Sequence, residues 1–284
     1  MRKIEYVRDT ADQCSSFHHM VFGFLKQRRR QQLRARPFPD MWRRIVERNV
    51  PLFRRLPAED QTELLGHVQV FLAEKTFEGC GGLELTDEMR VTIAAQACLL
   101  LLHRPTDYFP NLTTILLYPS EYTEHSVRRV DGDIWEEGPE DRLGHTAHRL
   151  RAMVLAWDAV KRATDNPGAG NLVIHEFAHQ LDFENHGTDG MPDLRTTAES
   201  TAWSKLINEE LQALRRAQAI GAPTVLDTYG AQNQAEFFAV ATEAFFERPR
   251  ALRAEHPALY DALQRYFRQD LASRYVEAES AWRI

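Results

Sequence analysis

The segment from Asn171 to Asp182 constrains this chain more than any other part of the sequence. Most of its residues are apolar, and Asn-Pro-Gly at 166–168 precedes it, so we predict a helix that packs in the core. His175 and His179 are four positions apart and therefore lie on one face of that helix, about one turn from each other. Imidazoles in such a setting need polar partners, and one metal ion can serve both rings.

The residues His175-Glu-Phe-Ala-His179 form an HExxH pattern, which places two imidazoles at the spacing that a single zinc ion needs. Glu176 is turned by about 100° from His175 around the helix, so it flanks the metal and can hold and deprotonate a water molecule. The alternative is that both histidines are satisfied by backbone carbonyls. The apolar surroundings favour the metal, because it satisfies two buried rings at once.

A catalytic zinc site has three protein ligands and one open position. We favour Glu236 as the third ligand, because it begins an otherwise apolar segment in which a carboxylate has no generic reason to be buried. Glu243 lies seven residues further on nearly the same face. One of these carboxylates can bind the metal while the other orients a ligand histidine, although both can also be solvent-facing charges.

Other residues compete for the third position or for supporting roles. Glu199 follows His179 by 20 residues, a spacing found in thermolysin-like enzymes, but its surroundings lack their NExxSD pattern. His186 is one position away from the place that a metzincin would use. Asp182 can accept the second ring N–H of a ligand histidine. Tyr229 precedes Glu236 by seven residues and can donate a hydrogen bond to an oxyanion, although most tyrosines are structural.

Composition sets the class of protein. The chain has 284 residues, 43% hydrophobic and 27% charged, enough for a substantial core. No stretch approaches 18 consecutive apolar residues and the N-terminus lacks a secretory pattern, so we expect no membrane span and no export. The cysteines, at positions 14, 80 and 98, have no CxxC spacing, which argues against disulfides and against a cysteine-bound metal. We therefore expect a cytoplasmic protein.

Charge is distributed unevenly along the chain. Residues 1–55 contain 14 lysines and arginines against 5 acidic residues, a net charge of +9, which leaves −15 for the rest of a chain whose total is −6. Such a basic segment can contact nucleic acid, an anionic membrane or an acidic partner. A solvated helix face is the simpler interpretation. Because no nucleic-acid motif is present, we expect no direct nucleic-acid binding.

The chain divides into a basic, loosely ordered extension over residues 1–36, which prolines 37 and 39 end, and one domain over residues 37–284. Helical periodicity dominates the domain, at 42–48, 59–74, 86–102, 171–182, 198–219, 234–247 and after 257. Short β-rich segments predict strands at 113–118 and 152–157, and the glycine-containing stretch 131–148 predicts an irregular loop. We therefore predict an α+β fold that is mostly helical, with a small sheet.

Two long strings of residues resemble the Mlc titration factor A family of zinc peptidases. They are NLVIHEFAHQLD at 171–182 and YGAQNQAEFFAV at 229–240, and the likeness runs from about Pro37 to the last helix. Shorter matches are FEG at 77–79, TDEMRVTIAAQACLLLL at 86–102, YPS at 118–120 and FFERP at 245–249. The catalytic centre of anthrax lethal factor is similar, including a tyrosine seven residues before the ligand glutamate.

This resemblance implies a zincin-like metallopeptidase domain with an HExxH active-site helix and one zinc ion per chain. It implies that His175, His179 and Glu236 bind the zinc, that Glu176 is the general base and that Tyr229 is the oxyanion donor. Aminopeptidase-type activity on peptide or protein substrates follows from the family. The founding member also binds the repressor Mlc, which implies a transcriptional repressor as partner and a role in regulating sugar phosphotransferase genes. The alternative is a regulatory module that sequesters a transcription factor, with zinc structural or incidental.

Overall fold

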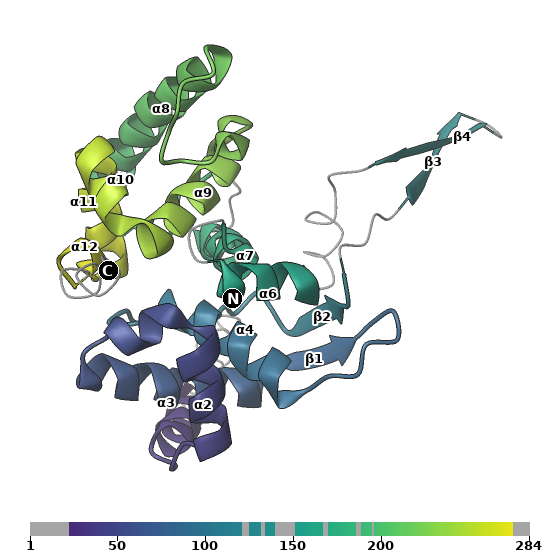
Figure 1. Ribbon diagram of the computed structural model, residues 1–284, viewed down its shortest axis with the longest axis vertical. Helices are drawn as coiled ribbons and strands as arrows, with labels where there is room; N and C mark the ends of the chain where they lie inside the picture. The colour runs from purple at the N-terminus through teal and green to yellow at the C-terminus, as the bar shows by residue number, and fades with distance from the viewer. Residues whose placement is uncertain are drawn as a thin grey trace, which may run out of the picture.

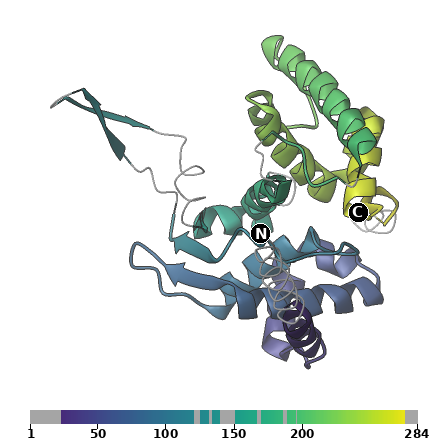
Figure 2. The ribbon, with the colours of Figure 1, turned by 180° about the vertical axis from the view of Figure 1, so that it is seen from behind.

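The computed structural model describes residues 23–120, 125–131, 134–139, 151–166, 170–185, 189–194 and 196–274, and the chain is mostly helical there, as predicted. Figures 1 and 2 show three groups of helices that follow the order of the chain. The first is α2 (Asp40–Asn49), α3 (Ala58–Glu74) and α4 (Asp87–Leu99); the second is α6 (Trp157–Asp165) and α7 (Leu172–Asp182); the third is α8 (Thr197–Ala219), α9 (Gln234–Glu247), α10 (Pro249–Glu255), α11 (Pro257–Phe267) and α12 (Leu271–Arg274). Short 3-10 helices are η1 (Pro51–Arg55), η2 (Phe183–Asn185) and η3 (Thr228–Ala231).

A small parallel sheet lies beside the first two groups (Figure 1). Its strand order is β1 (Thr76–Gly79), β2 (Thr114–Tyr118) and β5 (Ala152–Ala156). The two predicted strands are confirmed, whereas β1 was missed because four residues are too few to give a period-two signal. In the described part of the chain, no strand pairs with the outer edge of β5.

The prediction of an irregular loop at 131–148 is wrong where the structure describes that stretch. Residues His125–Asp131 (β3) and Ile134–Pro139 (β4) pair as antiparallel strands. The signal was present, because Asp-Gly at 131–132 is a dipeptide that favours tight hairpin turns. Residues 132–133 and 140–148 lie outside the described ranges.

Two central helices form the core that positions the site. The side chain of Thr86 caps α4 by accepting a hydrogen bond from the backbone N–H of Met89, and residues 91–99 are buried. On α7, the Asn171 side chain caps the first turn by accepting from the backbone N–H of Ile174. Phe177 of this helix is fully buried. Since the apolar face of α7 is fixed in the core, its histidine-bearing face is held in one orientation. Within the described ranges, no helix combines the length and apolar character that a membrane crossing requires.

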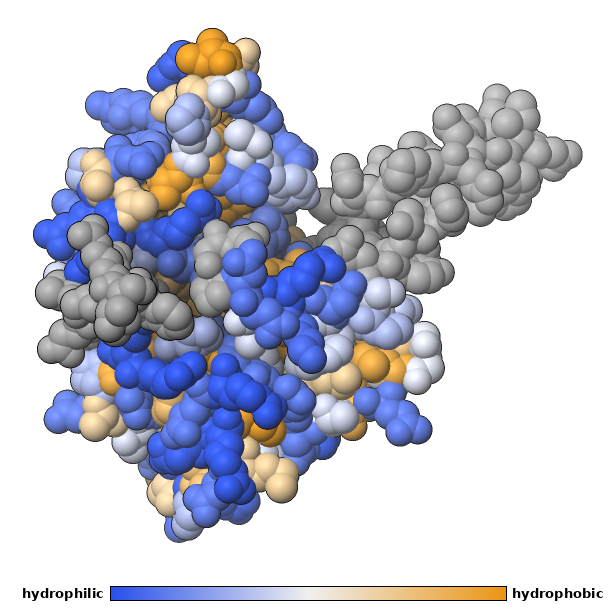
Figure 3. Space-filling view, in the orientation of Figure 1, coloured by the Kyte–Doolittle hydropathy of each residue, from blue (hydrophilic) through white to orange (hydrophobic). Residues whose placement is uncertain are grey.

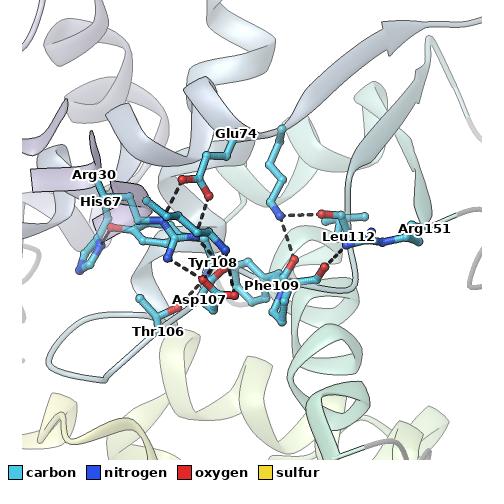
Figure 4. A network of polar contacts seen from close by, with 12 residues as sticks. Arg30, His67, Glu74, Thr106, Asp107, Tyr108, Phe109, Leu112 and Arg151 are labelled. Carbon is cyan, nitrogen blue, oxygen red and sulfur yellow. Dashed lines mark hydrogen bonds and ion pairs between the residues drawn. The ribbon is translucent and has the colours of Figure 1, made fainter. Parts of the chain in front are cut away.

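Residues 23–34, which we expected to be loosely ordered, form a helix that is tied to the domain. Arg30 is the anchor: its guanidinium lies 2.7 Å from Glu74 Oε2 and 2.6 Å from Asp107 Oδ1, and only 3% of its side chain is exposed (Figure 4). It also lies over the ring of Tyr108, at 4.6 Å from the ring centroid. Residues 1–22 lie outside the described ranges, so the expected disorder is untested there.

We expect Arg30→Met to lower the free energy of unfolding by about 2–3 kcal/mol, because it leaves Glu74 without its cation and leaves Asp107 with Lys26 alone. The loss should be smaller than for a fully buried pair, since Asp107 is half exposed. Urea unfolding followed by circular dichroism measures the difference. The matched control is Arg29→Met, at an exposed position of the same helix, where a change below about 0.5 kcal/mol is expected. Equal effects of the two substitutions would show that the helix is not anchored by Arg30.

Candidate metal centre

Two neighbouring helices bring the predicted site residues together. The helix α7 carries His175, Glu176 and His179, and α9 carries Glu236 in its first turn. The position of Glu236 is fixed locally, because the side chain of Asn233 caps α9 by accepting a hydrogen bond from the Glu236 backbone N–H at 2.9 Å.

Three side-chain atoms converge between these helices. His175 Nε2 lies 3.1 Å from Glu236 Oε2, His179 Nε2 lies 3.2 Å from His175 Nε2, and His179 Nε2 lies 3.5 Å from Glu236 Oε2. A tetrahedral zinc ion with bonds of about 2.0–2.2 Å requires its ligand atoms to lie about 3.3–3.6 Å apart. The measured triangle is close to that size, so the donor set and its spacing fit zinc.

The electrostatics of the triangle also suit a cation. Burial by itself lowers the pKa of His175, but the hydrogen-bonded carboxylates of Glu236 and Glu243 outweigh it and raise that pKa to about 10. Burial raises the pKa of Glu236, but hydrogen bonds from both histidines outweigh it and hold the pKa at about 2. In the metal-free protein a positive charge is thus held among carboxylates, where a divalent metal ion can take the place of the proton.

Glu243 occupies the opposite side of the His175 ring. Its Oε1 lies 2.7 Å from His175 Nδ1, and its Oε2 accepts a hydrogen bond from the Asn171 backbone N–H at 2.6 Å. A carboxylate at Nδ1 keeps the proton on that nitrogen and leaves Nε2 free for a metal. The structure therefore gives the two carboxylates different positions, with Glu236, the carboxylate that the sequence favoured as ligand, beside both Nε2 atoms and Glu243 behind one ring.

We expect Glu243→Gln to weaken zinc binding by about 10–100-fold, because the amide keeps the shape but not the charge of the group that orients His175. Competition with a chromophoric chelator measures the affinity. The control is Glu255→Gln, at an exposed position that ends α10, which should leave the affinity unchanged. An affinity of Glu243→Gln equal to that of the wild type would exclude an orienting role for Glu243.

A cleft of about 560 Å³ opens beside the triangle. Glu176 and Tyr229 both line it, together with His175 and Glu243. Glu176 is half-buried, whereas 47% of Tyr229 is exposed, and the tyrosine ring lies 5.9 Å from the His175 ring between centroids. The helix α6, which the sequence analysis did not predict, forms the other wall through Ala159, Arg162, Ala163 and Asp165.

Three other residues that the sequence offered as ligands or supporting groups are not seen to contact the metal triangle. The Asp182 carboxylate does not make the hydrogen bond expected from His179: its Oδ2 accepts from the Gly190 backbone N–H at 3.0 Å, and its buried Oδ1 has no hydrogen-bond partner among the described residues. Burial raises the pKa of Asp182 to about 6. Glu199 closes a capping box with Thr196 at the start of α8 and is not part of the triangle. His186 lies outside the described residues.

A second group of possible ligands, Asp60, Glu63 and His103, fits a metal ion less well. His103 Nε2 lies 3.2 Å from Asp60 Oδ1, but its other ring nitrogen, Nδ1, lies 3.3 Å from Glu63 Oε2. One imidazole presents a single nitrogen to a given ion, so these two carboxylates flank the ring rather than share a metal with it.

Two histidines one helical turn apart, a carboxylate from a second helix and a glutamate in the adjoining cleft are the arrangement of a metallopeptidase. The chain matches the model of the family described as glucose-regulated metallo-peptidase M90 over residues 24–268, and it belongs to that family. The match begins inside the segment that we predicted to be an extension, in agreement with the anchored helix at residues 23–34.

Several bacterial proteins are similar to this chain over most of their length. It is 37% identical over 240 residues to the uncharacterized protein slr2042 of Synechocystis sp., covering 84% of this chain and 87% of that protein. It is 30% identical over 232 residues to Mlc titration factor A of Edwardsiella ictaluri, covering 81% and 88%. The Yersinia pestis protein of the same name is 29% identical over 248 residues, covering 82% and 86%. The resemblance that the sequence motifs indicated is therefore confirmed.

Proposed function

We propose that this chain is a zinc-dependent peptidase that hydrolyses peptide bonds, with one zinc ion held by His175, His179 and Glu236. The observation that carries the proposal is the triangle of 3.1, 3.2 and 3.5 Å between the two Nε2 atoms and the carboxylate oxygen. The adjoining cleft supports it, because His175 of the triangle lines it together with Glu176 and Tyr229. Membership of a metallopeptidase family gives independent support.

Bound zinc would supply Lewis-acid chemistry, which activates water and polarises the scissile carbonyl. Glu176 removes the proton of the attacking water as its oxygen bonds to the carbonyl carbon. The same carboxylic acid then returns the proton to the nitrogen as the C–N bond breaks. The hydroxyl of Tyr229 donates a hydrogen bond to the oxyanion that develops on the carbonyl oxygen. Glu243 holds the ring of His175 throughout.

The outer edge of β5 offers a way to align an extended substrate. Main-chain groups of Met153 and its neighbours can pair with a peptide added at that edge, since no described strand covers it. The helix α7 contacts β5, so a peptide on this edge is near the HExxH segment. We propose peptides or proteins as substrates and, from the family resemblance, aminopeptidase-type cleavage.

The proposal also includes a binding partner and a cellular location for this protein. Two of the relatives are named Mlc titration factor A, and we propose a transcriptional repressor of the Mlc type as a partner, with sugar phosphotransferase genes as the regulated target. We place the protein in the cytoplasm, where thiols stay reduced, because Cys80 and Cys98 are free.

The proposal is tested by hydrolysis of a mixed peptide library, with products identified by mass spectrometry. Protein stripped with a chelator should be inactive, and one equivalent of zinc should restore cleavage. Release of single N-terminal residues would support the aminopeptidase assignment, whereas internal cleavage would replace it with endopeptidase activity. Hydrolysis that continues at full rate in the stripped protein would contradict zinc-dependent catalysis.

A further inference from the structure

A groove of about 570 Å³ lies in the N-terminal group of helices. Residues of α2, η1 and α3 line it, and none of them lines the cleft at the metal centre. We call it the arginine groove, because three of its six lining residues are arginines: Arg44, Glu47, Arg48, Phe53, Arg54 and Gln61.

The arginine groove belongs to the most positively charged segment of the chain. Residues 23–55 contain 11 lysines and arginines against 2 acidic residues, a net charge of +9 in a chain whose total is −6. Figure 3 shows strongly hydrophilic residues spread over the face where Figure 1 places α2 and α3. This charge is part of the folded surface and not of a separate tail.

The arginines of the groove have fewer acidic partners for their positive charge than Arg30 has. Arg30 is neutralised by Glu74 and Asp107. By contrast, Arg44 and Arg54 are exposed, and neither forms an ion pair with another described residue. Arg48 lies 2.9 Å from Glu88, but 64% of its side chain remains exposed. Three arginines against one lining carboxylate, Glu47, leave the concave surface with an excess of positive charge, which favours an anionic ligand.

Exposed apolar side chains lie on the same segment. Phe24 and Leu25 of the helix at residues 23–34 and Met41 of α2 are 67%, 52% and 62% exposed. Arginine, methionine and aromatic residues are the types that protein–protein interfaces favour. A single-stranded nucleic acid requires a series of aromatic side chains for base stacking, and Phe24 is the one exposed aromatic residue in the described range 23–55. The composition therefore favours a polypeptide.

We propose that the arginine groove docks an acidic, partly apolar polypeptide segment of a partner protein. The forked guanidinium groups match carboxylates in shape and charge, and the exposed Met41, three positions before Arg44 on α2, offers an apolar contact next to the groove. This docking surface is separate from the metal centre and does not depend on peptidase activity.

The test is fluorescence anisotropy with a fluorescein-labelled twelve-residue peptide of alternating Glu and Leu, made from D-amino acids so that it resists hydrolysis. In the full-length chain, the double variant Arg44→Glu/Arg54→Glu should weaken binding by at least about tenfold, because like charges then face the probe. Arg216→Glu, an exposed charge reversal on α8, is the control and should bind as the wild type does. Added salt should weaken the wild-type interaction.

Unchanged binding by the double variant would overturn the proposal. The proposal would also be overturned if a single-stranded DNA of twelve nucleotides bound as tightly as the peptide and the double variant lost this DNA binding. The groove would then bind any polyanion. Circular dichroism verifies folding, and Arg44→Gln/Arg54→Gln replaces the reversal if the latter unfolds. Peptide hydrolysis should be the same in wild type and both double variants, so failure here is separable from failure of the peptidase proposal.

Discussion

Replacing Glu176 by glutamine is expected to lower kcat for peptide hydrolysis by at least about 10²–10⁴-fold while one zinc ion stays bound per chain. Glu176 lines the cleft beside the metal triangle, but its carboxylate is not one of the three converging ligand atoms. The amide keeps the size of the side chain and loses the ability to take a proton from water. Steady-state kinetics and elemental analysis on the same preparation measure both quantities.

The control for this experiment is Glu209→Gln, an exposed position on α8, which should retain wild-type activity. If Glu176→Gln hydrolyses peptides at the wild-type rate, another group accepts the proton and the proposed mechanism is wrong. A joint loss of zinc and activity would instead give Glu176 a role in binding the metal.

Replacing Glu236 by alanine is expected to remove most of the zinc from the purified protein. Loss of a group that orients a ligand costs about 10–100-fold in affinity, so loss of a ligand itself should cost at least about 100-fold. Glu236 supplies the only carboxylate oxygen in the triangle formed with His175 and His179. Zinc content per chain after dialysis, measured by elemental analysis, gives the result.

The matched control for the third ligand is Glu199→Ala. Because Glu199 caps α8, this variant should lose some stability, typically about 1 kcal/mol, and keep its zinc. Full zinc in Glu236→Ala together with depleted zinc in Glu199→Ala would show that the third ligand was assigned to the wrong glutamate.

Local sequence signals were sufficient to predict the helix that carries the HExxH pattern. The apolar pattern of residues 171–182 and the Asn-Pro-Gly break before it are read directly from neighbouring positions, so the helix and its histidine spacing were predictable. The apolar surroundings of Glu236 favoured it as the metal ligand, but the place of Glu243 was not predictable, because it depends on how α9 packs against α7 some 60 residues away in the chain. The sequence resemblance favoured Glu236, and the distances around His175 support it.

Two of the errors, at residues 23–34 and at Asp182, arise from contacts that are distant in sequence. Arg30 marks an ordered helix only because Glu74 and Asp107, 44 and 77 residues further on, surround it. Asp182 is on the correct face of α7 for His179, but Gly190 takes its carboxylate oxygen. Gly190 has a φ of 69°, and a Cβ there would lie 2.2 Å from the Gln234 carbonyl oxygen, so backbone packing fixes this contact.

Binding of zinc among His175, His179 and Glu236 is tested by X-ray diffraction from zinc-loaded crystals at the zinc absorption edge. We expect an anomalous peak about 2.0–2.2 Å from the two Nε2 atoms and the nearest oxygen of Glu236. A peak at Asp60, Glu63 and His103 with none in this triangle, or no peak at full zinc loading, would contradict it.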